Sequence, residues 1–332
     1  MPTRFAILGF GHHAVRRLIG GFRGAQESEL VGLWRRDLQA AAANAKEFDI
    51  PNVFASATEL CESPQVDAVF ITSPDSLHSE HALLAMRHGK AVLCEKPLAK
   101  DSHQAQQMLE ASQQFGVAFG VAQNFRFNRS VETMRQWIVE GLIGQPLLAQ
   151  SQFAYPVAKS SRTWIYDTSL AVGGPIGDVG VHSIDALRYI LQTEMTSVAT
   201  LATPPATPGG VELTASMQLM CSNGVLANVT VTGGMPYRTL LEVSGSEGLI
   251  RAENGLTVDF PITVKHWREG KCLRQETMSN ADGYSRMLDT FSQSLRGAAV
   301  YPASGADGVK NQKILDAAYR SWHTGQREEI PQ

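Results

Sequence analysis

The sequence predicts an α/β protein in which a doubly wound parallel sheet precedes an α+β region with a large open, mainly antiparallel sheet. Three observations support this fold class. Short apolar runs alternate with helix-like segments in the N-terminal third, glycine ends several of those helices, and the later part carries β-type runs joined by short glycine turns. We expect a first domain over residues 1–122 and a second over residues 123–332.

Length and composition allow two domains and favour a small-molecule partner. The chain has 332 residues, of which 43% are hydrophobic and 18% charged, and a domain takes roughly 150 residues. The formal net charge is −3, without a block of like charges. Nucleic acid or an anionic membrane surface would call for a basic patch, so we expect neither as a partner.

The cysteines and the N-terminus indicate a cytoplasmic protein. The four cysteines are scattered without a CxxC pair, which favours free, mostly buried thiols in a reducing compartment. The first apolar run is too short for a signal peptide. No stretch reaches the roughly 18 apolar residues that a membrane helix needs.

In the N-terminal part, buried-strand patterns and helical patterns follow one another, as in a parallel sheet. The strand patterns cover residues 4–11, 29–36, 66–74, 90–97 and 117–124. The helical patterns between them cover residues 14–24, 37–50, 79–89 and 102–116, and the last two end in glycine.

In the C-terminal part, the turns SNG, SEG and REG join β-type runs and predict hairpins of an antiparallel sheet. The runs cover residues 146–157, 211–233, 238–254 and 262–278. Helices that interrupt or flank the sheet are expected at about 130–141, 178–191, 284–296 and 308–324.

The first strand leads into Gly9-x-Gly11-x-x-Ala14. In the dinucleotide fingerprint of the Rossmann fold, the first glycine permits the tight turn, the second lets the backbone approach a pyrophosphate, and the small third residue lets helix and strand pack closely. The pattern alone is weak and also fits an ordinary turn, but its place at the first strand–helix junction favours dinucleotide binding. His12 and His13 on this turn are expected to pack there or touch the pyrophosphate.

The end of the second strand bears on the choice between NADP and NAD. An acidic residue usually meets the ribose 2′-hydroxyl of NAD there, whereas arginine accommodates the 2′-phosphate of NADP. Here Arg35 and Arg36 occupy this place and Asp37 follows. We favour NADP and leave NAD possible, because Asp37 could still reach a ribose. The alternative is that both arginines are solvated and Asp37 only caps the next helix.

A lysine follows another buried strand, in Glu95-Lys96-Pro97. Strand C-termini of a doubly wound sheet face the ligand crevice, so Lys96 is expected to act on a ligand, and a cis Lys96–Pro97 peptide would aim it inward. The alternative is a Glu–Lys surface pair. His78, after the preceding strand, is expected to line the same cleft.

A glycine-rich stretch, GGPIGDVGVHSID, places Asp178, His182 and Asp185 on one face of a predicted helix. Asp178 and His182 would lie about 6 Å apart along the helix axis. A carboxylate beside an imidazole suits proton transfer at neutral pH, and the bare glycines would let the backbone approach a ligand. Alternatives are a capped helix with Asp178 as N-cap, or a metal-binding pair, which lacks further ligands nearby and leads us to expect no metal.

The chain resembles the glucose–fructose oxidoreductase / inositol dehydrogenase family (Gfo/Idh/MocA) along nearly its whole length. The resemblance lies in GFGHHA (9–14), ITSPDSLHSEHALLAMRHGKAVLCEKPLA (71–99), GGPIGDVGVHSID (173–185) and DGVKNQKILDAAYRSWHTGQ (307–326). It implies an N-terminal Rossmann domain and NAD(P)-dependent hydride transfer on a sugar, cyclitol or related polyol. It also implies a homodimer or homotetramer formed through the C-terminal sheet.

The resemblance assigns roles to individual residues. His182 would take the proton from the substrate hydroxyl or return it in reduction, Lys96 would hold and polarise that oxygen, and Asp178 would position Lys96 or the substrate. The residues expected at the cofactor are Gly9, Phe10, Gly11, His12, His13, Arg35, Arg36, Thr72, Ser73, Pro74, His78, Glu95, Lys96 and Asn124. Those expected at the substrate are Lys96, Arg126, Arg162, Trp164, Asp178, His182 and Tyr284.

Three departures from the family pattern stand out. The loop reads VGGPIG where the family often has three glycines and ALL, so Val172 and Pro175 could reshape the pocket. Asp75 replaces a common asparagine, and Arg35 replaces the common acid. None affects Lys96, Asp178 or His182. Two other functions stay open: a glycosidase that retains NAD and cleaves by transient oxidation, and a non-catalytic sugar or nucleotide sensor, which would have no need of these three residues.

Overall fold

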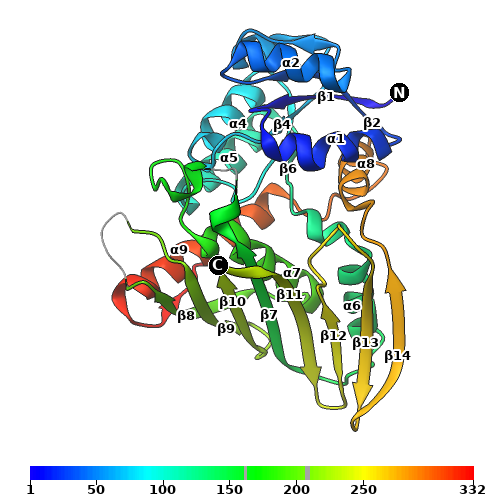
Figure 1. Ribbon diagram of the computed structural model, residues 1–332, viewed down its shortest axis with the longest axis vertical. Helices are drawn as coiled ribbons and strands as arrows, with labels where there is room; N and C mark the ends of the chain where they lie inside the picture. The colour runs from blue at the N-terminus through cyan, green and yellow to red at the C-terminus, as the bar shows by residue number, and fades with distance from the viewer. Residues whose placement is uncertain (161–162, 206–209) are drawn as a thin grey trace. The chain divides into compact units, whose positions relative to one another are not determined.

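The computed structural model describes residues 1–160, 163–205 and 210–332. The described chain divides into two compact units, each assembled from two pieces of sequence. Figure 1 colours both units by residue number. The N-terminal unit comprises residues 1–123 and 284–312, and the C-terminal unit comprises residues 124–283 and 313–332.

In the N-terminal unit, the described residues form a six-stranded sheet in the order β3-β2-β1-β4-β5-β6. All neighbouring strands run parallel. The strand order reverses between β1 and β4, so the predicted doubly wound sheet is confirmed and its ligand crevice is expected at this junction. The strands are β1 (Thr3–Leu8), β2 (Ser28–Trp34), β3 (Asn52–Val53), β4 (Ala68–Ile71), β5 (Ala91–Cys94) and β6 (Phe119–Val121).

Helices pack on both faces of this parallel sheet (Figure 1). On one face the ring of Phe5 in β1 lies 5.5 Å from Phe22 and 6.1 Å from Phe291. On the other face Ile71 joins Met86 and Met108 in one buried cluster. The helices are α1 (Ile19–Gly24), α2 (Leu38–Phe48), α3 (Ala57–Glu62), α4 (His78–Arg87), α5 (Ser102–Phe115) and α8 (Gly283–Leu295), with the turns η1 (Ala14–Leu18) and η2 (Asp75–Leu77).

In the C-terminal unit, the described residues form a nine-stranded sheet in the order β14-β13-β12-β11-β7-β10-β9-β8-β15. The SNG, SEG and REG turns join β9 to β10, β11 to β12 and β13 to β14 as antiparallel pairs, which confirms a mainly antiparallel sheet. β7 and β10 pair in parallel. The strands are β7 (Pro146–Pro156), β8 (Met195–Thr203), β9 (Thr214–Cys221), β10 (Leu226–Thr232), β11 (Gly234–Gly245), β12 (Leu249–Glu253), β13 (Ile262–Arg268), β14 (Lys271–Met278) and β15 (Glu328–Glu329).

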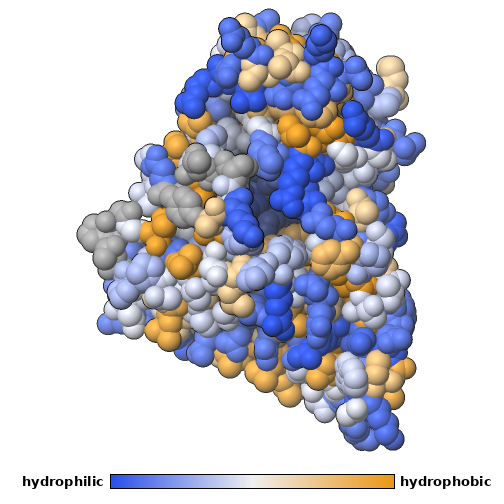
Figure 2. All heavy atoms as spheres, viewed as in Figure 1, coloured by the Kyte–Doolittle hydropathy of each residue, from blue (hydrophilic) through white to orange (hydrophobic). Residues whose placement is uncertain are grey.

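One face of this large sheet is covered by helices, with α6 over β12 and β13 and α7 over β7 and β10. The other face points outward, where Leu148, Leu201 and Leu226 are exposed. Figure 2 shows apolar side chains interspersed with polar ones over this unit. The helices of this unit are α6 (Arg129–Val139), α7 (Val181–Leu191) and, from Lys313 onward, α9 (Gly305–Thr324), whose first residues belong to the N-terminal unit. The turns are η3 (Asn124–Phe127), η4 (Val157–Lys159), η5 (Thr163–Tyr166) and η6 (Ile176–Gly180). None of the described helices is both long and apolar enough to cross a membrane.

Candidate active site

The turn after β1 lies against the end of β4 at the carboxyl edge of the parallel sheet. Gly9 has a φ of +94°, and a Cβ there would lie 2.6 Å from the Ser73 backbone nitrogen. The Thr72 hydroxyl donates a hydrogen bond of 3.0 Å to the Gly9 carbonyl. Only glycine tolerates both this conformation and this approach, so Gly9 fixes the two strand ends together.

The two residues after Gly9 differ in what surrounds them. Phe10 is buried, its ring centroid lies 6.3 Å from that of Phe48, and its N–H is donated to the Trp34 carbonyl. A Cβ on Gly11 would make only an ordinary contact, with the Gly9 oxygen at 3.7 Å. Gly11 is partly exposed and a side chain there would not clash, so the predicted approach of a phosphate group stays a prediction.

The first helix opens with the wide turn η1 in place of the regular α-helix expected from Ala14 onward. Ala14 is fully buried, as the fingerprint requires, whereas His12 is exposed. The Val15 N–H bonds to the Gly11 carbonyl, so helical bonding begins at the glycine turn itself.

The two arginines after β2 are held differently. Arg35 Nη1 donates to Asn44 Oδ1 at 2.9 Å, whereas Arg36 is exposed. Asp37 is the N-cap of α2, and its carboxylate accepts a bond from the Ala40 N–H at 3.0 Å. Arg36 is thus the more exposed cation of the pair, and the carboxylate of Asp37 is already engaged by the helix.

Glu95 and Lys96 follow β5, and the Lys96–Pro97 peptide is cis, as expected. Glu95 Oε1 lies 2.9 Å from His13 Nε2, and Glu95 Oε2 accepts a bond from the Lys96 N–H at 3.2 Å. Burial alone would raise the pKa of Glu95, but the charge and hydrogen bond of His13, with Lys96, hold the pKa below its usual value. Glu95 is therefore a buried anion that ties the glycine turn to the lysine.

His78 links the end of β4 to the turn after β5. Its ring is 1% exposed, with Nε2 2.8 Å from the Ser73 carbonyl oxygen and Nδ1 2.9 Å from the Pro97 carbonyl oxygen. Carbonyl oxygens only accept, so both contacts are hydrogen bonds only when both ring nitrogens carry a hydrogen. This geometry makes His78 a bridge within the unit, and its predicted contact with the cofactor stays a prediction.

In the C-terminal unit, Asp178 and His182 belong to two successive helical segments. The helix does not begin at Asp178, because the wide turn η6 starts at Ile176 and α7 follows from Val181. Asp178 therefore lies inside a turn, with its N–H bonded to the Gly174 carbonyl, and is not the N-cap that the capped-helix alternative assumed. Within the described residues, no three His, Cys, Asp or Glu side chains form a metal-binding group.

The His182 ring is 9% exposed and lies among aromatic rings of its own unit. The Phe125 ring is 4.6 Å away, edge-on, and the Phe153 ring is stacked at 6.2 Å. These rings come from η3 and β7, two elements distant in sequence. These ring contacts restrict the plane of the imidazole.

Glycine occupies the positions before Asp178 for a different structural reason from the one expected. A Cβ on Gly173 would overlap the Tyr319 hydroxyl, and one on Gly174 would overlap the Glu212 backbone oxygen. Neither glycine has a positive φ. The loop is thus packed against two protein side chains, where a ligand had been expected to need the room.

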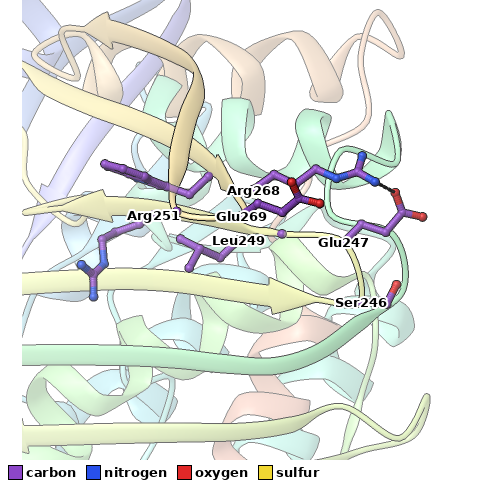
Figure 3. Close-up of a pocket in the computed structure, with 9 residues that line it drawn as sticks. Ser246, Glu247, Leu249, Arg251, Arg268 and Glu269 are labelled. Carbon is purple, nitrogen blue, oxygen red and sulfur yellow. Dashed lines mark ion pairs between the residues drawn. The ribbon is translucent and has the colours of Figure 1, made fainter.

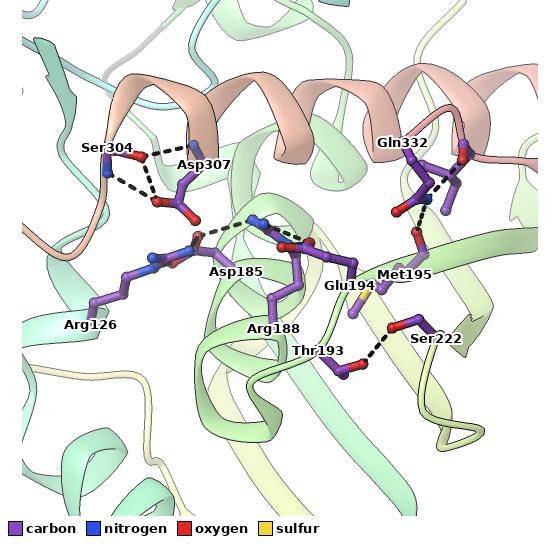
Figure 4. Close-up of polar contacts among 11 residues, drawn as sticks. Arg126, Asp185, Arg188, Thr193, Glu194, Met195, Ser222, Ser304, Asp307 and Gln332 are labelled. Carbon is purple, nitrogen blue, oxygen red and sulfur yellow. Dashed lines mark hydrogen bonds and ion pairs between the residues drawn. The ribbon is translucent and has the colours of Figure 1, made fainter.

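Asp185, the third polar residue of the motif, belongs to a buried ion-pair cluster (Figure 4). Its carboxylate accepts two bonds from Arg126, of 2.8 and 2.7 Å, and lies 3.9 Å from Arg188. Arg188 Nη2 lies 2.7 Å from Glu194. Arg126 is 4% exposed and bound to Asp185 at two positions, so its predicted contact with a substrate stays a prediction.

The other predicted substrate and cofactor residues are distributed between the two units. Asn124 is buried in η3 and Trp164 is half-buried in η5, both in the C-terminal unit. Tyr284 belongs to the N-terminal unit, where its ring lies 6.1 Å from His13. Arg162 lies outside the described residues.

A large hollow of the C-terminal unit lies elsewhere. It has a volume of about 570 Å³ and is lined by hairpin residues of β11 to β14, including the ion pair Glu247–Arg268 at 3.2 Å. Figure 3 shows these side chains around the hollow. None of the predicted site residues lines it.

Two family models match the chain, one for each part. Residues 3–123 match the oxidoreductase family with an NAD-binding Rossmann fold, and residues 131–251 match the GFO/IDH/MocA C-terminal domain. The chain belongs to the Gfo/Idh/MocA family. The predicted membership is thereby confirmed, and so is the predicted enzyme class, because this family consists of oxidoreductases with an NAD-binding domain.

Named relatives of this Gfo/Idh/MocA protein act on sugars. It is 31% identical to 1,5-anhydro-D-fructose reductase of Ensifer adhaerens, over 99% of this chain and 98% of the relative. It is 27% identical to D-xylose 1-dehydrogenase (NADP(+)) 2 of Haloferax volcanii, over 98% and 99%. The structure of aldose-aldose oxidoreductase from Caulobacter crescentus, complexed with glycerol, shares the fold with a TM-score of 0.90 at 22% identity, covering 99% and 100% of the two chains.

Sequence reasoning missed Glu212 and Tyr319, which contact the glycine loop, and the rings that enclose His182. Glu212 is a single acid after a Pro/Gly loop, and Tyr319 lies in the late helix that carried part of the family resemblance. Neither has a local pattern that points to the loop, since their partners lie far away along the chain.

Proposed function

We propose that this protein is an NADP(H)-dependent oxidoreductase of a sugar, cyclitol or related polyol, with Lys96, Asp178 and His182 as its proton-transfer and orienting residues. The observation that carries the proposal is the family match over both parts of the chain, together with Lys96 at the carboxyl edge of the parallel sheet. The relatives named above support a sugar substrate.

The nicotinamide, when bound, supplies or accepts the hydride. The chain's own residues would then handle charge and protons. His182 accepts the substrate hydroxyl proton in oxidation or donates it in reduction, and its aromatic surroundings keep the imidazole oriented. The Lys96 ammonium holds and polarises the same substrate oxygen. Asp178 orients the substrate or the lysine.

The proposed cofactor site uses the turn from Gly9 to His13, Thr72 to Pro74, and Glu95. The backbone at Gly11 would receive the pyrophosphate, and the exposed Arg36 would meet the 2′-phosphate of NADP. We propose residues 1–122 as the dinucleotide-binding domain and residues 123–332 as the substrate-binding and oligomerisation domain.

The outward face of the large sheet supports a homodimer or homotetramer, because Leu148, Leu201 and Leu226 are exposed on it. Light scattering coupled to size-exclusion chromatography tests this, and a monomer at micromolar concentration would contradict it. A cytoplasmic location is proposed from the four cysteines, which all lie in the described part of the chain as free thiols.

The function is tested first by calorimetric titration with NADP⁺ and NAD⁺, after absorbance shows whether the purified protein retains a cofactor. We expect reversible binding with a preference for NADP⁺. Turnover is then measured with NADPH and 1,5-anhydro-D-fructose, and with NADP⁺ and D-xylose or myo-inositol. Tightly retained NAD without net turnover would favour a glycosidase, and no binding of either cofactor would overturn the enzyme proposal.

A further inference from the structure

The loop before Asp178 is held by one carboxylate and one phenol. Glu212 Oε2 accepts a hydrogen bond from the Gly174 N–H at 3.1 Å, and Oε1 accepts one from the Ile176 N–H at 2.6 Å. The Tyr319 hydroxyl accepts from the Gly177 N–H at 3.1 Å and donates to Glu212 Oε1 at 3.2 Å. We call these two side chains the loop clamp.

The clamp satisfies backbone groups that a helix start leaves without intrahelical partners. The first N–H groups of a helical segment need an acceptor from elsewhere, and Pro175 has no N–H to offer. The clamp residues bind the N–H groups on both sides of this proline, directly before and within η6 (Ile176–Gly180). The start of the turn that carries Asp178 is therefore fixed by residues outside it.

The clamp joins three distant parts of the C-terminal unit. Glu212 lies just before β9, 38 residues from Gly174, and Tyr319 lies on α9, 142 residues from Gly177. The glycines are matched to it, because a Cβ on Gly173 would overlap the Tyr319 hydroxyl and one on Gly174 would overlap the Glu212 backbone oxygen. Loop and clamp are complementary in shape as well as in hydrogen bonding.

Burying a carboxylate at position 212 costs free energy, which indicates that the loop requires this group. Glu212 is 2% exposed, and its hydrogen-bond partners are backbone N–H groups and a phenol. Burial raises the pKa of Glu212, although those hydrogen bonds partly oppose the rise. A carboxylate accepts at both oxygens, whereas a carboxamide accepts at only one. The loop geometry uses both.

We propose that Glu212, with Tyr319, is a positioning residue that fixes the 173–177 loop and thereby the Asp178 and His182 side chains for proton transfer. This inference rests on the proposed function. The hydrogen bonds of the clamp run to the loop backbone and between the two clamp residues, so in this proposal it acts through the turn. Its loss should lower kcat while leaving substrate and cofactor binding largely intact.

The test uses Glu212→Gln and Tyr319→Phe in the full chain. In Glu212→Gln, the amide group faces a backbone N–H, donor against donor, so the loop shifts. Because a displacement of about 1 Å can cost about 100-fold in rate, we expect kcat to fall by about 10- to 100-fold. KM for 1,5-anhydro-D-fructose and Kd for NADPH should change less than about threefold. Tyr319→Phe should lower kcat by about fivefold.

Two further variants make the readout specific. The double variant should be no slower than Glu212→Gln alone, because both residues serve one unit and their effects should not add. Glu242→Gln is the matched control: Glu242 is also a buried glutamate of this unit, but its carboxylate pairs with Arg251 on the large sheet. Its kcat should equal that of the wild type.

Amide hydrogen exchange measures how strongly the clamp holds the loop, and it needs no substrate. We expect the peptide spanning residues 171–180 to exchange at least about tenfold faster in Glu212→Gln and in Tyr319→Phe, with Glu242→Gln unchanged. If Glu212→Gln does not fold, Tyr319→Phe carries the test by itself, since it removes a single hydroxyl.

The outcomes separate the two proposals. A wild type that turns over no sugar in the panel contradicts the proposed function, and exchange then decides whether the clamp exists. Unchanged exchange in both variants overturns the clamp. Faster exchange with an unchanged kcat would show that the clamp stabilises the loop without affecting catalysis, and would overturn the positioning role. Faster exchange with a reduced kcat and a steady KM supports it.

Discussion

The chain has two glycine-rich turns at candidate functional positions. The structural reason for the glycines differs between them. At residues 9–11, Gly9 is required by its positive φ and by the Ser73 backbone, but a Cβ on Gly11 would make only an ordinary contact. At residues 173–177, the φ values are ordinary and the space beside Gly173 and Gly174 is filled by Tyr319 and Glu212. A glycine motif can therefore mean room for a ligand or a close fit between protein groups, and the sequence does not distinguish them.

Gly9→Ala should break the first turn most severely. The substitution places a Cβ 2.6 Å from the Ser73 backbone nitrogen at a φ of +94°, and we expect a loss of about 3 kcal/mol or more in the free energy of unfolding of this unit. Chemical denaturation followed by circular dichroism measures it. Gly11→Ala is the control and should change stability by less than about 0.5 kcal/mol; an equal loss would contradict the contrast.

Gly174→Ala should break the second turn. Its Cβ would overlap the Glu212 backbone oxygen, so the loop must move, with an expected loss of about 2 kcal/mol and a fall in kcat similar to that of Glu212→Gln. Thermal unfolding and steady-state kinetics check both. A stable, fully active variant would show that the loop adapts freely.

Two buried side chains beside these turns, His81 and Glu212, should change the stability of the fold in opposite senses as pH changes. This sharpens the comparison. His81 bonds to the Ser73 hydroxyl, and burial, with His78, lowers its pKa from 6.5 to about 4. The neutral imidazole is thus favoured in the folded state, and its contribution is complete above pH 6.5 and lost as pH falls towards 4. The loss is at most about 3 kcal/mol. Glu212 has a raised pKa, so its contribution is complete at low pH and is lost as pH rises through that pKa.

The measurement compares melting temperatures of the wild type, His81→Gln and Glu212→Gln between pH 5 and 8. Relative to the wild type, His81→Gln should gain as pH falls, because it no longer loses the neutral imidazole. Glu212→Gln should gain as pH rises, because it has no buried carboxylate to ionise. Parallel pH profiles for all three proteins would rule out both assignments.

The smallest expected effects concern the cofactor side of the first turn. Arg36→Ala should weaken NADP⁺ binding by about tenfold and leave NAD⁺ binding unchanged, because an exposed guanidinium is available for the 2′-phosphate. Arg35→Ala should weaken NADP⁺ binding by no more than about threefold, since Arg35 already bonds to Asn44. Calorimetry with both cofactors decides, and equal losses for NADP⁺ and NAD⁺ would remove the phosphate role.

The local part of the fold was predictable from sequence. The strand before Gly9 and the hairpins at SNG, SEG and REG follow from neighbouring residues, which carry their own turn chemistry. The short β3 and α3 were not predicted, since two and six residues carry little periodicity. The piece 284–312 that joins the N-terminal unit was not predicted either, because its contacts depend on tertiary packing.

The sequence indicated which residues belong to the candidate site better than it indicated what those residues contact. Lys96, Asp178 and His182 stand out through the family motifs, and their roles stay predictions. The ion pair of Arg126 with Asp185 could not be foreseen, because each charge looks available in sequence and only the fold shows them bonded over 59 residues. Glu212 lacks any motif, and its significance comes from the two N–H groups that the fold presents to it.

The parallel pairing of β7 with β10 has a consequence for biosynthesis. β7 is central in the large sheet, yet it is the first strand of that sheet to leave the ribosome. Its partners β10 and β11 begin only at Leu226 and Gly234, so both edges of a long strand wait without hydrogen-bonding neighbours while the rest is translated. An edge in that condition can recruit other chains. Gln150 and Gln152, which make the middle of one face of β7 polar between Leu148 and Ala154, are suited to limiting aggregation during that interval.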